Sequence, residues 1–137
     1  MTTVTTNIAS KNSETAAALL RVVNGGLFTF HGLFKAFVFT FAGTAAYFQS
    51  IGLPGFLAYL TIAVEVVGGL ALLAGYKTRL VSLVMIPVLL GAAYFGHGAN
   101  GFVFSNPNGG WEYPAFWAVV MAVQALLGAG AYAVDNR

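Results

Sequence analysis

The chain has 137 residues, of which 58% are hydrophobic and 7% are charged, with no cysteine and a formal net charge of +2. Soluble domains average about 25% charged residues, so this composition excludes an ordinary soluble domain. The few, scattered basic residues give no footprint for nucleic acid. Without cysteine there is no disulfide, thiolate nucleophile or cysteine-ligated metal centre. We therefore expect an all-α integral membrane protein whose first partner is the lipid bilayer.

Residues 1–13 are polar and rich in threonine, and they predict a flexible cytoplasmic tail. Residues 14–137 then form a single membrane domain that begins at a capping Ser13. The first apolar span is expected at about residues 16–38. A signal peptide cleaved near residues 42–46 is the alternative, but His31 and Lys35 interrupt the apolar run that it would need.

The first span carries a stripe of polar side chains on one helical face. Asn24, His31 and Lys35 fall within a narrow arc, and Arg21 lies beside them. Three glycines next to the stripe would let another helix come close. The stripe is therefore predicted to face the interior of the bundle.

Residues 39–52 are too short to cross a bilayer and predict a short interfacial or re-entrant helix. The second span, residues 54–75, is long and apolar enough to cross, but it carries Glu65 near its middle. A charge there costs about 2.5–3.5 kcal/mol on insertion scales, so Glu65 needs a partner. His31 is the first expected partner and Lys35 the second. Gly68 and Gly69, one turn further on, predict close helix packing.

A basic turn with Lys77 and Arg79 leads to a third span at about residues 80–97, which Pro87 is expected to kink. The turn-rich sequence SNPNGG precedes a fourth span at about residues 112–132. Four spans with the basic turn inside place both termini in the cytoplasm. The chain is thus predicted to be a multi-pass protein of a prokaryotic cytoplasmic (inner) membrane.

This topology gathers ionisable and polar groups in the outer half of the bundle, above Glu65. The ligand-binding candidates are His31, Lys35, Glu65, His97, Asn100 and Glu112, and His31 and Glu65 are the best catalytic candidates. The alternative is structural: Glu65 pairs with His31, Lys35 or Arg21, and Glu112 with Lys35, to fix helix register. For Arg21 we favour a structural role, because it can snorkel to the inner interface.

Three kinds of bound group were weighed for this cluster. A metal could use His31, Glu65, His97 and Glu112, but the Glu-x-x-His pairs of di-iron bundles are missing, so no metal is favoured. A haem held by His31 and His97 is a hypothesis with no more support than a metal. A quinone or another small polar ligand needs only a pocket with a few converging polar groups and is the simplest hypothesis. No nucleophile with its base and no nucleotide-binding motif is present.

In sequence order, LLRVVNGGLFTFHGLFK, EVVGGLALLAGYKTRL, HGANGF, GGWEY and GAGAYAVD resemble the DoxX family of small four-helix membrane proteins. The resemblance covers nearly all of the chain after the tail. It implies a cytoplasmic-membrane protein associated with redox chemistry, because family members are linked to a thiosulfate:quinone oxidoreductase and to a mycobacterial complex with a sulfurtransferase and a superoxide dismutase. The matching motif residues are Arg21, His31, Gly32, Lys35, Glu65, Gly68, Gly69, Arg79, His97, Asn100, Gly101 and Glu112.

Two hypotheses follow. The first is a membrane subunit or accessory of a quinone-linked redox complex, related to sulfur or oxidative-stress chemistry, in which His31 and Glu65 move the proton of quinone chemistry. It needs a protein partner or a second copy of the chain and would not be catalytic alone. The second is a non-catalytic anchor or assembly protein whose polar cluster only fixes helix packing. A small transporter is a remote third, because the inverted repeat typical of that class is missing.

Overall fold

The structure, a computed structural model, describes residues 2–135, and the regular secondary structure of that range is entirely helical. Helix α1 (Thr2–Phe34) continues into a π-helical turn, η1 (Lys35–Thr40), and is followed by the short α2 (Phe41–Ser50). Helix α3 (Phe56–Ala74) precedes α4 (Thr78–Gly91) and a second π-helical turn, η2 (Ala92–Gly96). A 3₁₀ turn, η3 (Gly98–Asn100), and a loop lead to α5 (Glu112–Leu127). The predicted all-α fold, with a short helix between the first two spans, is confirmed.

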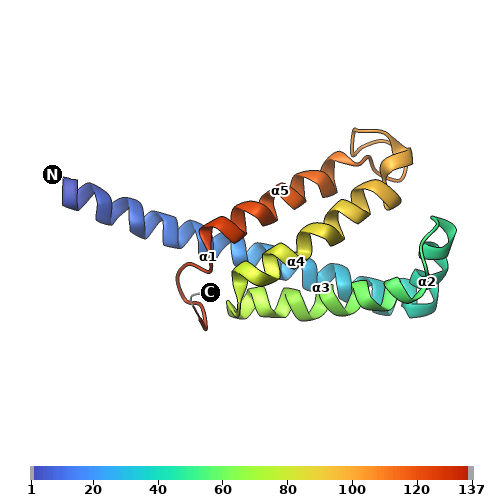
Figure 1. The fold of residues 1–137 in the computed structure, drawn as a ribbon, viewed down its shortest axis with the longest axis horizontal. Helices are drawn as coiled ribbons and strands as arrows, with labels where there is room; N and C mark the ends of the chain where they lie inside the picture. Colours follow the sequence, from blue (N-terminus) through green and yellow to red (C-terminus); the bar gives the residue numbers. More distant parts are fainter. Residues whose placement is uncertain (1, 136–137) are drawn as a thin grey trace.

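The helices form two crossing pairs (Figure 1). Helix α1 packs chiefly on α3, and α4 packs chiefly on α5. The buried residues where the pairs meet include Phe28, Leu72, Met85, Trp117 and Met121. The rings of Phe28 and Trp117 stack with centroids 4.2 Å apart and join α1 to α5. We call the end of the bundle that holds α2 and the loop of residues 101–111 the loop end.

Helix α1 begins much earlier than the sequence predicted. Residues 2–13 were expected to be a flexible tail, but α1 is helical from Thr2, and its first turns project beyond the bundle (Figure 1). No glycine or proline lies between residues 1 and 23. Once a helix is nucleated, each added residue extends it at little cost, so α1 can continue past the point where its packing ends.

Glycines bring the backbones of α1 and α3 close together. A Cβ atom added to Gly25 would lie 2.7 Å from the Leu73 nitrogen and 2.8 Å from the Gly69 oxygen. A Cβ atom on Gly69 would lie 2.6 Å from the Thr29 nitrogen. Gly68 instead makes room for the Met85 side chain of α4. The two neighbouring glycines of α3 therefore serve two different helix contacts.

In the described part of the chain, three helical stretches are long and apolar enough to cross a membrane: Ser10–Ser50, Phe56–Ala74 and Thr78–Gly96. Helix α5 is apolar but shorter, with 16 residues. The prediction that this span continues to residue 132 is wrong. The chain leaves the helix at Gly128, whose φ of 81° favours glycine, and turns back toward the connection between α3 and α4 (Figure 1).

The segment after α5 is fastened by hydrogen bonds. The Val134 nitrogen donates to the Ala74 oxygen at 3.0 Å, and the Lys77 nitrogen at the start of α4 donates to the Asp135 carboxylate at 3.1 Å. A carboxylate at a helix N-terminus satisfies a free N–H group and interacts favourably with the helix dipole. This contact ties the end of the described chain to α3 and α4.

Candidate functional site

A cavity of about 550 Å³ lies toward the loop end, between α1, α3, α4 and α5. This volume falls within the range of roughly 300–1,000 Å³ that is common for small-molecule sites. Most of its lining is apolar. The residues of the lining that carry polar side-chain atoms are His31, Lys35, Tyr47, Thr61, Glu65, His97, Tyr113 and Trp117.

An ion pair forms the most polar part of the cavity. Lys35 Nζ lies 2.6 Å from Glu65 Oε1, with 26% of the Lys35 side chain exposed and only 5% of the Glu65 side chain. The carboxylate that sits near the middle of the second span therefore has its partner on the first. A charged hydrogen bond of this kind is short and stronger than a neutral one.

The partner of Glu65 is Lys35, so the preference for His31 is wrong. Gly32 explains why: a Cβ atom added there would lie 3.2 Å from the Cβ of Glu65, so this side of α1 faces the carboxylate. Lys35 is three residues after Gly32 and shares its face of the helix. His31 is rotated by about 100° from Gly32 and points elsewhere.

His31 faces α5 across the cavity. Its Nε2 atom lies 3.5 Å from the Tyr113 hydroxyl oxygen, and its ring centroid lies 5.5 Å from that of Trp117. Tyr113 and Trp117 are one helical turn apart and present the same side of α5. The cavity thus has an ionic wall at Lys35 and Glu65 and an aromatic wall at His31, Tyr113 and Trp117.

His97 also borders the cavity, but it is held by the loop. Its Nδ1 atom lies 3.0 Å from the Gly109 carbonyl oxygen. Asn100 donates to the same carbonyl at 2.9 Å, and the Glu112 carboxylate accepts from the Phe104 nitrogen at 2.9 Å. Asn100 and Glu112 do not line the cavity, so the structure places them as loop supports. The predicted pair of Glu112 with Lys35 does not form, because the carboxylate is turned toward the loop.

Among residues 2–135, no three His, Asp or Glu side chains converge in a way that could hold a metal ion. In particular, His31, Glu65, His97 and Glu112 are not brought together as a ligand set. The polar groups that do converge are one ammonium, one carboxylate, an imidazole and a phenol. Such a set can donate and accept hydrogen bonds with a polar ligand head and exchange protons with it.

Arg21 lies at the opposite end of the bundle and is 2% exposed, so it does not snorkel. Its guanidinium donates to the Leu72 and Leu73 oxygens at the end of α3, at 2.9 and 3.0 Å, and to the Ala129 and Ala131 oxygens after α5, at 2.8 and 2.9 Å. The planar guanidinium satisfies carbonyl groups that helix ends leave free. Arg21 therefore joins three segments of the chain.

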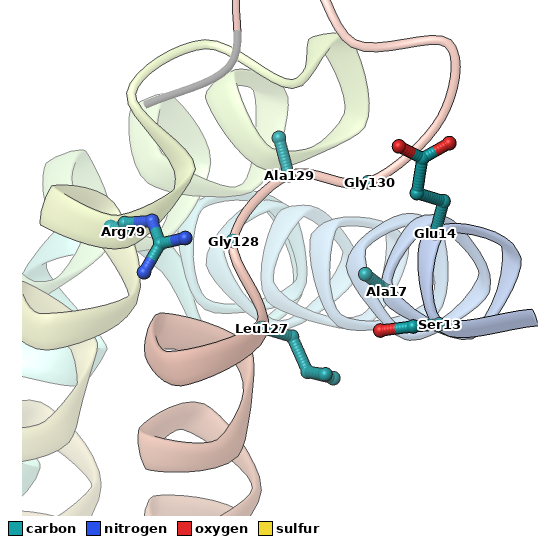
Figure 2. Close-up of a pocket in the computed structure, with 8 residues that line it drawn as sticks. All are labelled: Ser13, Glu14, Ala17, Arg79, Leu127, Gly128, Ala129 and Gly130. Atoms are coloured by element: carbon teal, nitrogen blue, oxygen red, sulfur yellow. The ribbon is translucent and has the colours of Figure 1, made fainter. Parts of the chain in front are cut away.

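Beside it is a smaller hollow of about 190 Å³, lined by residues of α1, Arg79 and the segment after α5 (Figure 2). Arg79 donates to the Ala125 and Leu126 oxygens at 3.2 and 3.3 Å, which closes the end of α5. The Glu14 carboxylate in Figure 2 lies across the segment from Arg79, and no ion pair joins the two. The arginine beside this hollow binds carbonyl groups at a helix end, so the large cavity is the candidate site.

Sequence reasoning missed several residues of the cavity, among them Tyr47, Thr61 and Trp117. Tyr113 was not among the predicted site residues either. The spacing of Tyr113 and Trp117 by four residues was the available signal, because it places both rings on one helical face. Asn24 was part of the predicted stripe, and it accepts from Trp117 Nε1 at 3.0 Å below the cavity.

The fold and the cavity define an all-helical integral membrane protein with a mostly apolar cavity and an ion pair in its wall. The profile of the DoxX family matches residues 16–98, more than half of the sequence. The chain belongs to the DoxX family, as the sequence motifs predicted.

Three bacterial proteins are similar to the chain. "Putative oxidoreductase CatD" of Bacillus subtilis (strain 168) is 41% identical over 83 residues, which cover 61% of this chain and 60% of CatD. "Inner membrane protein YqjF" of Escherichia coli (strain K12) is 32% identical over 104 residues, covering 70% of this chain and 72% of YqjF. An "Uncharacterized protein" of Haemophilus influenzae is 30% identical over 122 residues, which cover 88% of each chain. No solved structure matches the chain.

Proposed function

We propose that this protein is a membrane subunit or accessory of a redox complex and that its cavity binds a quinone-like or other small polar-headed ligand. The observation that carries the proposal is the Lys35–Glu65 pair, 2.6 Å between Nζ and Oε1, set in a mostly apolar cavity of about 550 Å³. The name of the Bacillus relative, an oxidoreductase, supports the redox class.

The geometry suits a ring with oxygen atoms at its edges. Lys35 Nζ and the Tyr113 hydroxyl can each donate to a ligand oxygen, and the ring can lie against Trp117. Reduction of a quinone to a quinol consumes two electrons and two protons. Lys35, Glu65 and His31 would hold and transfer the protons, and a protein partner would supply the electrons.

The cavity also has a suitable approach for an apolar ligand. Residues of α2, α3 and η2 line one side of it, and the Tyr47 hydroxyl bridges α2 to the Gly96 oxygen at 3.4 Å. That single contact is long for an O–H donor and therefore weak. We propose that a membrane-dissolved ligand enters between α2 and η2.

The proposal is tested with Glu65→Gln in membranes that contain the protein and its partners. Quinone-dependent turnover is expected to fall at least tenfold, because the substituted amide cannot take up or release a proton. The matched control is Glu14→Gln, which changes an exposed carboxylate on α1 beside the segment after α5, outside the cavity. Full turnover of Glu65→Gln at normal protein abundance would contradict the proposal.

A second candidate function is a non-catalytic anchor or assembly protein. It is favoured by polar contacts that join the helices of the bundle. The Lys35–Glu65 pair joins α1 to α3, and Gln124 of α5 donates to the Ala17 oxygen of α1 at 3.2 Å. For such a protein, Glu65→Gln would lower abundance or complex assembly in proportion to any lost activity. Identification of quinone, haem, metal and proteins after gentle purification would complete the comparison, and the absence of all four would favour the anchor.

A further inference from the structure

The loop between η3 and α5 has an apolar tip that the fold leaves uncovered. Phe102, Val103 and Phe104 are 55%, 45% and 64% exposed. Trp111, where the loop returns to α5, is also exposed, and its ring packs edge-to-face on Phe102 at 4.8 Å between centroids. We call these four residues the loop tip. Exposed aromatic residues at adjacent positions mark an interaction surface.

The backbone of the loop is held by hydrogen bonds within the loop itself. The Trp111 nitrogen donates to the Gly101 oxygen at 2.9 Å, and the Glu112 nitrogen donates to the Phe102 oxygen at 3.0 Å. The Phe104 nitrogen donates to the Glu112 carboxylate at 2.9 Å. Because irregular backbone is costly in a membrane unless its polar groups are paired, this pairing suits a loop that meets lipid.

The charge pattern points in the same direction. Residues 80–111 contain no Asp, Glu, Lys or Arg, so the loop carries no formal charge. The first ionised side chain after this stretch, Glu112, has its carboxylate engaged by the Phe104 nitrogen. A charged side chain costs nothing on a loop in water. On a loop in the interface of a bilayer, a charged side chain would lose part of its hydration, and a loop without charge avoids this cost.

The length of α5 supplies a third argument. Its 16 residues span about 24 Å at 1.5 Å per residue, less than the about 30 Å of a bilayer core. The loop tip adjoins the start of α5 and adds apolar surface where the helix is too short. Tyr94 in η2 and Phe116 in α5, the helical elements before and after the loop, are also exposed aromatic side chains.

We propose that the loop tip is a membrane anchor that inserts into the interface of the lipid bilayer at the loop end. Trp111 then lies at headgroup depth, where tryptophan is enriched, and Phe102 and Phe104 reach the upper acyl chains. The anchor closes the loop end of the cavity against water and leaves the side between α2 and η2 for lipid. The proposal does not depend on which ligand the cavity takes.

The chain has no cysteine, so a single nitroxide label can be placed without removing native residues. The test uses Phe104→Cys in the full chain, reconstituted in phosphatidylcholine–phosphatidylglycerol bilayers, with label accessibility measured to oxygen and to a water-soluble nickel chelate. Val119→Cys, exposed in the middle of α5, gives the lipid reference, and Ser13→Cys, exposed on α1 at the end of the bundle opposite to the loop end, gives the aqueous reference. Phe102→Cys is the second variant if Phe104→Cys does not keep wild-type helicity.

The expected oxygen-to-nickel accessibility ratio at position 104 is several-fold higher than at position 13 and close to the ratio at position 119. A matched label at the neighbouring Ser105 should give a lower ratio than position 104, because a polar residue is expected to point toward the headgroups. A ratio at 104 equal to that at 13 would overturn the proposal by placing the loop tip in water. Low accessibility to both reagents would also overturn it, because a second copy of the chain would then cover the loop tip.

Discussion

At the scale of single residues, the Lys35–Glu65 pair is the strongest constraint on the site. The carboxylate is almost fully buried, whereas a quarter of the lysine side chain is exposed. Removing one member of a fully buried pair costs about 3–5 kcal/mol, since the other charge is left without compensation. We expect Lys35→Met to lower the free energy of unfolding by less than this, about 1–3 kcal/mol, because water still reaches part of the site.

The double variant Lys35→Met with Glu65→Gln should be more stable than Lys35→Met alone, since it removes the stranded carboxylate together with its partner. Unfolding in mixed micelles of increasing denaturing detergent measures the four members of this cycle. Simple addition of the two single effects would mean that the pair does not interact in solution, and it would contradict the short contact seen here.

The same residues show how far sequence reasoning reaches. A carboxylate near the middle of an apolar span is costly unless it has a partner. For this reason Glu65 could be predicted as a site residue from the sequence. The choice between His31 and Lys35 depended on the rotation of α1 against α3, which the close approach at Gly32 fixes. Arg21 was assigned a structural role, but two of its four carbonyl partners lie in the turn after α5, and nothing in the pattern of apolar residues specified that turn.

At the scale of elements, the contact between α1 and α3 depends on glycine at one position and not at its neighbour. A Cβ atom on Gly25 would collide with the backbone of α3, whereas a Cβ atom on Gly26 meets nothing within 4 Å. We expect Gly25→Ala to lower the free energy of unfolding by about 1–3 kcal/mol, the usual range for an overpacked interior. Gly26→Ala should be neutral or stabilising by up to about 1 kcal/mol, since alanine favours the helix. Detergent unfolding of the two variants provides a matched comparison, and equal effects would contradict the close approach.

Helix types and order follow from the sequence, while helix ends do not. Apolar length predicts where a helix must cross a bilayer, but α1 extends beyond its apolar part because no residue stops it. The end of α5 is decided by Gly128, by Arg79 of α4, which binds carbonyls in the last turn of the helix, and by Arg21 of α1, which binds carbonyls after it. Contacts of this kind lie far apart in the sequence, so a local pattern cannot reveal them.

At the scale of the whole molecule, two of the elements that line the cavity depart from a regular α-helix. The π-helical turn η1 presents Lys35, and the π-helical turn η2 contributes Phe95 and Gly96 to the lining. Such turns widen a helix locally and are common at functional sites. The sequence predicted that residues from separate segments would gather at one end, and His31, Lys35, Glu65 and His97 do border one cavity. Asn100 and Glu112 do not line the cavity and instead form hydrogen bonds with the backbone of the loop beside it.

The charge distribution along the bundle predicts an orientation in the membrane. Lys77 and Arg79 lie at the end opposite to the loop end, and residues 80–111 carry no Lys or Arg. Because basic residues accumulate on the cytoplasmic side, we expect both termini in the cytoplasm and the loop tip on the outer side. A fluorescent protein that folds only in the cytoplasm should be fluorescent when it is fused to either terminus. An alkaline phosphatase reporter, active only outside, should work when it is inserted beside Asn106 and fail after Arg137. The reverse pattern would contradict the predicted orientation and would place the loop tip and the cavity at the cytoplasmic face.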